Sequence, residues 1–163
     1  MAKRKSTSDA GPAAHDLLRL DNQLCFALYA ATRAISKTYR ERLGPLNLTY
    51  PQYLVLLVLW ENDGLNISDI GRKLMLDSGT LTPLIKRLEA MNIVTRQRGK
   101  DDEREVKVRL STKGRALKAG ALGARRFVAC RLDMSEQEIL ALRSDLMDLI
   151  GRLGAECESE AAE

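Results

Sequence analysis

The order of structural elements is decided by residues 67–110, which read ISDIGRKLMLDSGTLTPLIKRLEAMNIVTRQRGKDDEREVKVRL. The first part predicts two short helices, because aliphatic residues repeat every three or four positions and give each helix one buried face. A three-residue break, 75–77, separates the helices, and Asp77 or Ser78 can cap the second. The aliphatic positions are Ile67, Ile70 and Leu74 in the first helix, and Leu81, Leu84, Ile85 and Leu88 in the second.

Ser68 and Pro83 indicate where these two helices begin. We expect Ser68 to open the first helix and the second to end near Met91. Pro83 fits the second helix only if that helix begins near Thr80, which places the proline in the opening turn. Together the two segments predict a helix-turn-helix.

Two β-branched segments, 93–98 and 105–110, follow the helices. They flank residues 99–104, which consist of glycine and charged residues, so they predict a β-hairpin with a long polar tip. Two short helices followed by a charged hairpin have the order of a winged helix-turn-helix. An ordinary helix pair with a solvated hairpin is the alternative that the pattern leaves open.

Long helices are expected on both sides of this region. The first runs from His15 to Leu43 and ends at Gly44-Pro45. Thr49 then caps a helix that extends through Trp60. Beyond the hairpin, Ser111 caps a helix that reaches Cys130, and Ser135 opens the last helix.

The first and last helices each carry an apolar stripe longer than a small winged domain needs. We expect the stripes to bury one another across the two-fold axis of a homodimer; packing within one chain is the alternative. The stripes are Leu17, Leu20, Leu24, Leu28, Ala31 and Ile35 in the first helix, and Ile139, Leu142, Leu146, Leu149 and Leu153 in the last.

These patterns predict a mainly α fold with a small β-wing, in which a winged helix-turn-helix domain is flanked by long N- and C-terminal dimerisation helices. The expected divisions are a disordered tail at 1–14, the N-terminal dimerisation helix at 15–48, the DNA-binding winged helix-turn-helix at 49–110, the C-terminal dimerisation helices at 111–154 and an acidic tail at 155–163.

The composition argues against several classes of protein. The longest apolar run, Tyr53–Trp60, has eight residues and is too short to span a bilayer. No signal-peptide pattern follows the basic N-terminal residues, so we expect a cytoplasmic protein without a membrane partner. Three scattered cysteines and one histidine, His15, predict neither a disulfide scaffold nor a metal site, and we expect no cofactor.

The central segment has the charge expected of a nucleic-acid-binding surface, with twelve Lys/Arg against seven Asp/Glu from Ile67 to Arg115. Its second helix can present polar and basic side chains to the major groove. The hairpin cations can hold phosphates or enter a minor groove. The candidates are Ser78, Thr80, Thr82, Lys86 and Arg87 on the helix, and Arg96, Arg98, Lys100, Arg104 and Lys107 on the hairpin.

Residues 76–89, LDSGTLTPLIKRLE, followed by 101–114, DDEREVKVRLSTKG, resemble the MarR family of winged-helix repressors. The resemblance covers roughly residues 18–153. The family's hairpin tip carries an Asp-x-Arg pattern, so the resemblance implies that Arg104 enters the minor groove and that Asp102 helps to hold it. It also implies a homodimer, built from the terminal helices, on a pseudo-palindromic double-stranded operator.

Within this family, residues 20–29, LDNQLCFALY, resemble the OhrR group, whose members respond to organic hydroperoxides. The resemblance implies that Cys25 is the peroxidatic cysteine and that Tyr39 and Tyr50 hydrogen-bond its thiolate. It also implies that Cys130 is the resolving cysteine of the two-cysteine subgroup, which forms an intersubunit disulfide after Cys25 becomes a sulfenic acid.

The immediate neighbours of Cys25 do not activate its thiol. No Lys or Arg lies three or four residues away, and Asp21, one turn earlier, opposes a thiolate. Tyr39 is fourteen residues further along the same predicted helix, about 21 Å away at 1.5 Å per residue. Only in a dimer with antiparallel first helices can Tyr39 or, less tightly, Tyr50 approach Cys25 and lower its pKa. Tyr29, one turn beyond Cys25, is the competitor within the chain.

We therefore predict a redox-sensing repressor, not an enzyme, that leaves its operator when an organic hydroperoxide oxidises Cys25. One alternative is a MarR-type repressor released by a small aromatic ligand in the dimer crevice, without redox chemistry. A thiol peroxidase is the third possibility, opposed by the DNA-reading motif and by the lack of a histidine or arginine near Cys25. Cys157, in the acidic tail, is expected to be incidental.

Overall fold

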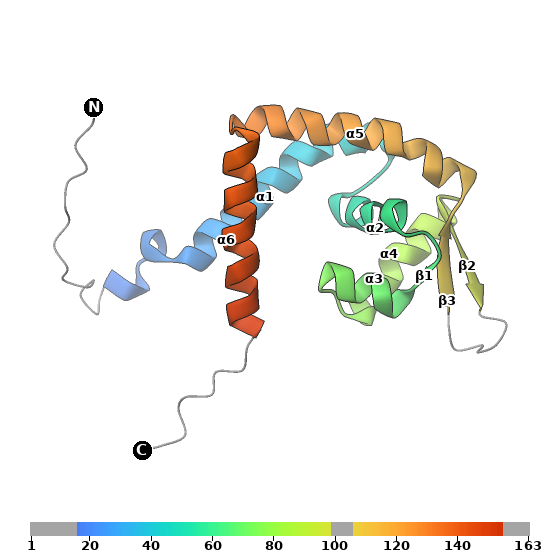
Figure 1. The fold of residues 1–163 in the computed structure, drawn as a ribbon, viewed down its shortest axis with the longest axis horizontal. Coiled ribbons are helices and arrows are strands. Elements are labelled where there is room, and N and C mark those ends of the chain that lie inside the picture. Colours follow the sequence, from blue (N-terminus) through green and yellow to red (C-terminus); the bar gives the residue numbers. More distant parts are fainter. Residues whose placement is uncertain (1–15, 99–105, 155–163) are drawn as a thin grey trace, which may run out of the picture.

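The computed structural model of the chain describes residues 16–98 and 106–154. These residues form a mainly helical fold with a small three-stranded sheet, which confirms the predicted fold class (Figure 1). The helices are α1 (Leu24–Leu43), α2 (Tyr50–Glu61), α3 (Ile67–Leu74), α4 (Ser78–Ala90), α5 (Thr112–Leu132) and α6 (Glu136–Gly154). The strands are β1 (Leu65–Asn66), β2 (Val94–Arg98) and β3 (Val106–Leu110), and short 3-10 turns cover Asp16–Leu18, Leu20–Asn22 and Gly44–Leu46.

The strands form one antiparallel sheet in the order β1-β3-β2. β2 and β3 are the arms of the predicted hairpin, in a register that pairs Val94 with Leu110. β1 was not predicted, because Leu65 and Asn66 are too few residues to show an alternating pattern. It pairs with β3 immediately before α3 begins.

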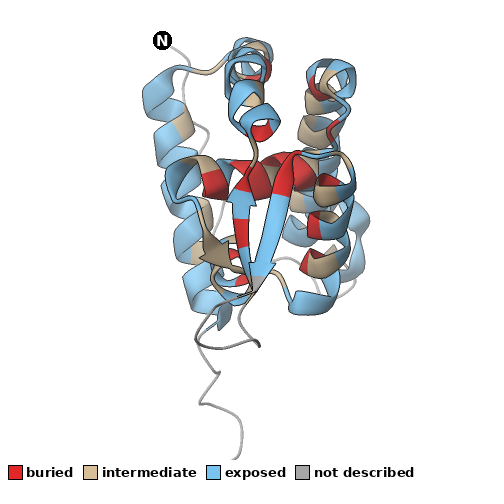
Figure 2. Cartoon of the chain, turned by 90° about the vertical axis from the view of Figure 1, so that its right-hand side faces the viewer, coloured by how far each residue is buried: buried red, intermediate tan, exposed pale blue. Residues whose placement is uncertain are grey.

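The buried core lies among α2, α3, α4 and one face of the sheet (Figure 2). In β3, Val108 and Leu110 are buried while Lys107 and Arg109 are exposed, so the strand has one inward and one outward face. The helix positions that the aliphatic spacing predicted to be inward are buried at Ile70, Leu81, Ile85 and Leu88, and α2 adds Tyr53, Val55, Leu56, Val58 and Leu59.

Side-chain caps determine where most helices begin. Four predicted helix starts are confirmed: Thr49 at α2, Asp77 at α4, Ser111 at α5 and Ser135 at α6, where the Ser135 hydroxyl accepts the Glu138 N–H. The cap of α3 was predicted wrongly, because Asn66 rather than Ser68 occupies that position. The side-chain oxygen of Asn66 accepts the backbone N–H of Asp69 at 2.7 Å and also the Ser68 hydroxyl at 2.8 Å.

Two further predicted helix limits were wrong. α4 begins at Ser78, so Pro83 lies inside the helix rather than in its opening turn. The first helix was predicted from His15, which lies outside the described residues; α1 begins at Leu24, after two 3-10 turns. Gln23 separates those turns from α1, because its backbone is extended and its side-chain amide donates to two carbonyls of the preceding turns.

α5 connects the winged region to the remaining helices. It starts at the end of β3 and packs along α2 and α1 (Figure 1). The guanidinium of Arg42 lies 4.3 Å from the ring centre of Phe127, and Arg131 pairs with Glu41 at 3.6 Å. These contacts hold the end of α1 against α5. Within 16–98 and 106–154, no helix is both long enough and apolar enough to cross a bilayer.

The first turn of α5 packs directly on the backbone at the start of the wing. A Cβ added at Gly114 would lie 2.2 Å from the carbonyl oxygen of Ile93, so only glycine fits without movement of the backbone. The Ser111 hydroxyl donates to the same carbonyl at 3.0 Å. The indole N–H of Trp60 donates to the Gly114 carbonyl, also at 3.0 Å, and thereby ties α2 to this turn.

We predict that Gly114→Ala lowers the free energy of unfolding by about 2 kcal/mol or more, because the added methyl group must displace the Ile93 backbone. Gly123→Ala is the matched control in the same helix, since nothing lies within 4 Å of its added Cβ. The control should be neutral or stabilising by about 0.5–1 kcal/mol. Urea unfolding of both variants tests the prediction, and equal midpoints would contradict it.

Candidate functional site

α3 and α4 form the helix-turn-helix, joined by a tight turn. Met75 has a left-handed backbone with φ of 54°, and a Cβ on Gly71 would lie 2.7 Å from the carbonyl oxygen of Leu76. These two features let α4 leave the turn close to α3. The predicted DNA-facing residues of α4 lie off its buried face: Ser78, Thr80, Lys86 and Arg87 are exposed, and Thr82 is half-buried.

The N-terminus of α4 is organised by Asp77. One carboxylate oxygen accepts the backbone N–H of Thr80 and the other accepts the Thr80 hydroxyl, both at 2.8 Å. These hydrogen bonds from Thr80 hold the pKa of Asp77 below its ordinary value. Thr80 therefore stabilises the helix start in the free protein, in addition to its predicted role at DNA.

Only part of the predicted wing can be placed. Lys107 is exposed on the outward face of β3. Arg96 lies on β2 beside α4, where its Nε is 2.7 Å from a carboxylate oxygen of Glu89. Lys100, Asp102 and Arg104, together with the side chain of Arg98, lie outside the described residues.

The base of the wing is fastened by Asp63, in the turn between α2 and β1. Its carboxylate accepts the backbone N–H of Leu110 at 2.8 Å and pairs with Arg115 of α5 at 2.6 Å. Arg115 also donates to the Leu110 carbonyl at 3.3 Å. One carboxylate thus joins the end of β3 to the first turn of α5.

The two predicted redox cysteines are exposed free thiols on different helices. Cys25 is the second residue of α1, whereas Cys130 lies near the end of α5, next to Arg131, which pairs with Glu41. Cys25 is sixteen residues before Glu41, about 24 Å along α1. The two sulfurs of one chain thus lie toward opposite ends of α1, so this conformation does not bring them within disulfide distance.

Tyr39 and Tyr50, the predicted thiolate partners, lie together in the chain. Their ring centres are 4.9 Å apart, and that of Tyr53 lies 5.3 Å from Tyr39 and 6.2 Å from Tyr50. Burial raises the pKa of all three hydroxyls, to about 12 for Tyr39, where the neighbouring Tyr53 hydroxyl also contributes. Sequence reasoning missed Tyr53, although its place three residues after Tyr50 on α2 was a signal that the two share a face.

Tyr29, the other tyrosine that could hydrogen-bond Cys25 within one chain, contacts Arg33 instead. Its hydroxyl accepts a hydrogen bond from Arg33 at 2.8 Å, and the Arg33 guanidinium lies 5.5 Å from its ring centre. Tyr29 is exposed, so this pair forms on the surface of α1. Among the described residues, no group of three His, Cys, Asp or Glu side chains is arranged to hold a metal ion.

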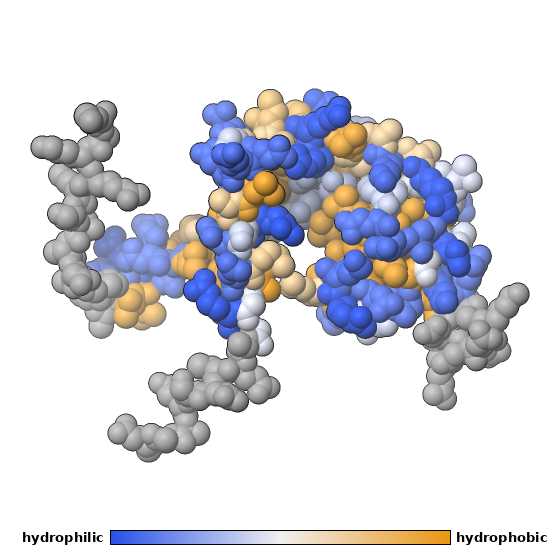
Figure 3. All heavy atoms as spheres, viewed as in Figure 1, coloured by the Kyte–Doolittle hydropathy of each residue, from blue (hydrophilic) through white to orange (hydrophobic). Residues whose placement is uncertain are grey.

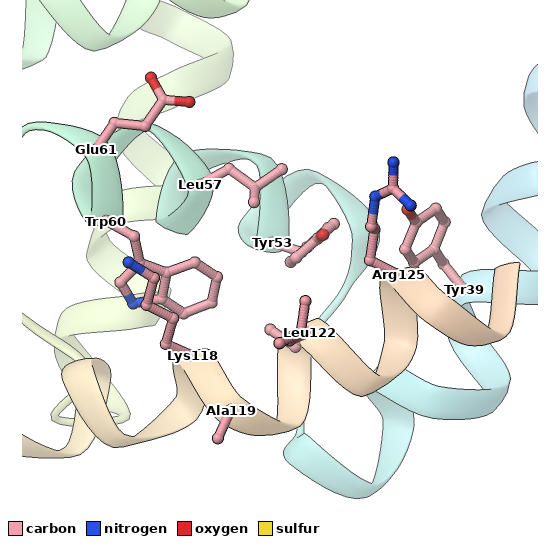
Figure 4. A pocket seen from close by; sticks show the side chains of 10 residues that line it. Tyr39, Tyr53, Leu57, Trp60, Glu61, Lys118, Ala119, Leu122 and Arg125 are labelled. Carbon is pink, nitrogen blue, oxygen red and sulfur yellow. The ribbon is translucent and has the colours of Figure 1, made fainter. Parts of the chain in front are cut away.

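A cavity of about 620 Å³ opens between α2 and α5, next to the tyrosine cluster (Figure 4). Its walls are mostly apolar and aromatic, and two cations, Lys118 and Arg125, line it from α5, with Glu61 from α2. Figure 4 shows the guanidinium of Arg125 beside the ring of Tyr39. The remaining lining residues are Tyr53, Leu57, Trp60, Ala119, Ala121 and Leu122.

The sequence matches known regulators over most of its length. Residues 37–120 match the family described as transcriptional regulator SarA/Rot. The organic hydroperoxide resistance transcriptional regulator of Bacillus subtilis (strain 168) is 43% identical over 138 residues, which cover 85% of this chain and 94% of that protein. The HTH-type transcriptional regulator TtmR of Methylorubrum extorquens (strain PA1) is 61% identical over 99 residues, which are 61% of this chain and about half, 51%, of TtmR.

Solved structures of AbfR from Staphylococcus epidermidis share the fold. Reduced AbfR bound to DNA matches with a TM-score of 0.72 and 33% identity, over 86% of this chain and 99% of that one. Disulfide-formed AbfR matches with a TM-score of 0.60 and 36% identity, over 83% and 96%. The TM-score to disulfide-formed AbfR is thus lower than the TM-score to reduced AbfR bound to DNA.

We predict that Asp77→Asn makes the protein less sensitive to acid. Because the pKa of Asp77 is lowered on folding, its cap stabilises the fold above its ordinary pKa, and this contribution is lost as the pH falls through the lowered value. The asparagine side-chain oxygen can still accept the Thr80 backbone N–H without titrating, while its NH2 group can only donate to the Thr80 hydroxyl. The drop in melting temperature from about pH 7 to about pH 3 should thus be smaller for Asp77→Asn.

Asp77→Ala is the control for this prediction, since it removes the cap at every pH and should melt earlier at both values. An Asp77→Asn protein that loses as much thermal stability on acidification as the wild type would contradict the assignment.

Proposed function

Because the chain belongs to the MarR family of winged-helix transcriptional regulators, we propose that it is a homodimeric repressor that leaves operator DNA when an organic hydroperoxide oxidises Cys25. The observation that carries this proposal is the similarity to the organic hydroperoxide regulator of Bacillus subtilis over nearly the whole of that protein. The relatives are named as regulators, which supports a binding role rather than catalytic turnover. A DNA-binding regulator of this kind would act in the cytoplasm.

Exposed apolar helices support the homodimer. The chain leaves large side chains uncovered on the N-terminal segment, where Leu18 is 89% exposed, and on α6, where Leu153 is 77% exposed and no residue is buried. Hydrophobic side chains are visible at the surface where α1 and α6 lie (Figure 3). In a homodimer, the N-terminal segment and α6 of a second copy would pack on these faces and remove the apolar area from water.

A dimer would also provide the surroundings that Cys25 lacks in one chain. With antiparallel α1 helices, Cys25 of one subunit would approach the tyrosine cluster of the other. The high pKa of Tyr39 keeps its hydroxyl protonated at neutral pH, so it could donate a hydrogen bond to a thiolate. Arg125 lines the same cavity as Tyr39 and would add a positive charge.

The proposed chemistry has two steps. The Cys25 thiolate attacks an oxygen of the hydroperoxide, the O–O bond breaks, and the alkoxide leaves as an alcohol after taking up a proton. Cys25 is then a sulfenic acid. The Cys130 thiol of the other subunit attacks this sulfur, a disulfide forms, and water leaves.

The disulfide would release DNA by changing the relative orientation of the two winged domains in the dimer. Cys130 is exposed near the end of α5, and α5 begins at the base of the wing, so a pull on its far end would act on the wing. The two winged domains of a dimer must match successive major grooves, which makes binding sensitive to their relative orientation. The lower similarity to disulfide-formed AbfR than to DNA-bound AbfR supports such a change.

We predict that cumene hydroperoxide lowers the affinity of the wild-type protein for a duplex that the reduced protein has selected from a random library, by at least about tenfold. Cys25→Ser should bind the same duplex in the reduced state and remain bound after peroxide. Cys130→Ser should reach the sulfenic acid but form no cross-linked dimer on a non-reducing gel. Peroxide-dependent release of Cys25→Ser would disprove the sensor assignment.

The cavity between α2 and α5 favours a second candidate function, release by a small aromatic ligand without oxidation. Its volume, aromatic walls and two cations suit an aromatic carboxylate. Trp60, the one tryptophan of the sequence, lines this cavity, so its fluorescence reports occupancy directly.

If this second function holds, benzoate should quench Trp60 fluorescence saturably and release the selected duplex from Cys25→Ser as well as from the wild type. Arg125→Gln should weaken the fluorescence response by about fivefold or more, because the carboxylate loses a charged donor. Unchanged fluorescence at millimolar benzoate would eliminate this candidate and leave the redox proposal intact.

A further inference from the structure

Glu89 and Arg96 form a contact between the recognition helix and the wing that the DNA-binding role does not by itself explain. Glu89 is the residue before the last in α4, and Arg96 is the third residue of β2. One carboxylate oxygen is 2.7 Å from the Arg96 Nε, and the other accepts the Arg96 backbone N–H at 3.3 Å. Glu89 thus accepts hydrogen bonds from both the side chain and the main chain of Arg96.

The strand pattern explains why Arg96 points toward α4. Successive side chains of a strand alternate between faces, so Arg96 shares its face with Val94, which is 1% exposed in the core. Thr95 and Gln97 belong to the outward face of β2. The side chains of Arg96 and Glu89 are 33% and 34% exposed, so the pair is partly shielded from water where β2 passes the end of α4.

The Glu89–Arg96 contact restrains the direction of the hairpin, which the turn from α4 to β2 does not do by itself. The turn from α4 to β2 is short and fixed, with Asn92 in a left-handed conformation and the Ile93 N–H bonded to the Leu88 carbonyl at 2.9 Å. It defines where β2 begins. The Glu89–Arg96 pair acts two residues further along the strand, so it controls the direction in which the hairpin leaves α4.

We propose that Glu89 and Arg96 are positioning residues that set the angle between the recognition helix and the wing, and that Arg96 is not a phosphate contact. A helix in the major groove and a wing beside it must reach the duplex together. Their relative angle therefore affects binding to a matched site more than binding to arbitrary DNA, which depends on charge. The inference rests on the DNA-binding function but not on the redox step.

The experiment measures affinity for two probes: a duplex of about 30 base pairs selected by the wild-type protein, and a shuffled duplex of the same composition. Glu89→Gln and Arg96→Gln should each weaken binding to the selected duplex by about threefold to tenfold, and the double variant should be no weaker than the single ones. Affinity for the shuffled duplex should stay within about twofold of wild type.

The salt dependence separates positioning from phosphate binding. A lost phosphate contact lowers the slope of log K against log salt by about one, whereas loss of a positioning residue leaves it unchanged. Arg96→Lys adds a second test, because lysine can hold a phosphate but cannot reproduce the Nε–carboxylate geometry, and should behave like Arg96→Gln. Lys107→Gln, on the outward face of β3, provides the comparison for loss of an exposed cation.

The proposal is overturned if Arg96→Gln weakens both duplexes equally and lowers the slope by about one, or if Arg96→Lys and Glu89→Gln bind the selected duplex as the wild type does. The melting temperature shows, independently of DNA binding, that each variant is folded. Failure of the DNA-binding function itself would be distinct, because the wild-type protein would then select no duplex.

Discussion

The contact between the first turn of α5 and the start of the wing is the constraint on which the rest of the structure depends. Gly114 permits it, and hydrogen bonds stabilise it, namely Ser111 to the Ile93 carbonyl, Trp60 to the Gly114 carbonyl and the Leu110 N–H to Asp63. Because α5 is one uninterrupted helix from Thr112 to Leu132, this small area fixes how the winged region is oriented relative to α1. We expect this hydrogen-bonded and partly buried junction to make the winged region and α5 move together.

The chain divides into a part that buries its own core and a part that does not. The winged region covers its aliphatic residues with its own helices and sheet, and its two DNA-reading elements are joined by the Glu89–Arg96 pair. The N-terminal segment and α6 instead leave leucines in contact with solvent. The winged region therefore folds around its own contacts, whereas the outer helices would gain most of their burial in the proposed homodimer.

The sequence predicted what depends on short-range patterns. The aliphatic spacing of α4, the caps at Thr49, Asp77 and Ser111, and the hairpin at 94–110 follow from local periodicity and hydrogen-bonding capacity. The prediction was wrong at the start of α1, where the apolar repeat continues but the extended Gln23 interrupts the helix. It also missed β1, which has too few residues to show an alternating pattern. At the candidate site, the exposure of the polar residues of α4 could be predicted from their spacing, but not the pairing of Arg96 with Glu89 or the place of Tyr53, since both arise from packing between elements.

The cluster of Tyr39, Tyr50 and Tyr53 has a consequence for what kind of signal the protein can register. Burial raises the pKa of all three hydroxyls, so all three stay protonated at neutral pH. Their hydrogen-bonding character therefore stays constant across the pH values at which cells live. The cluster therefore adds no pH dependence of its own to a group that binds against it, and the pH dependence of such a contact is set by that group alone.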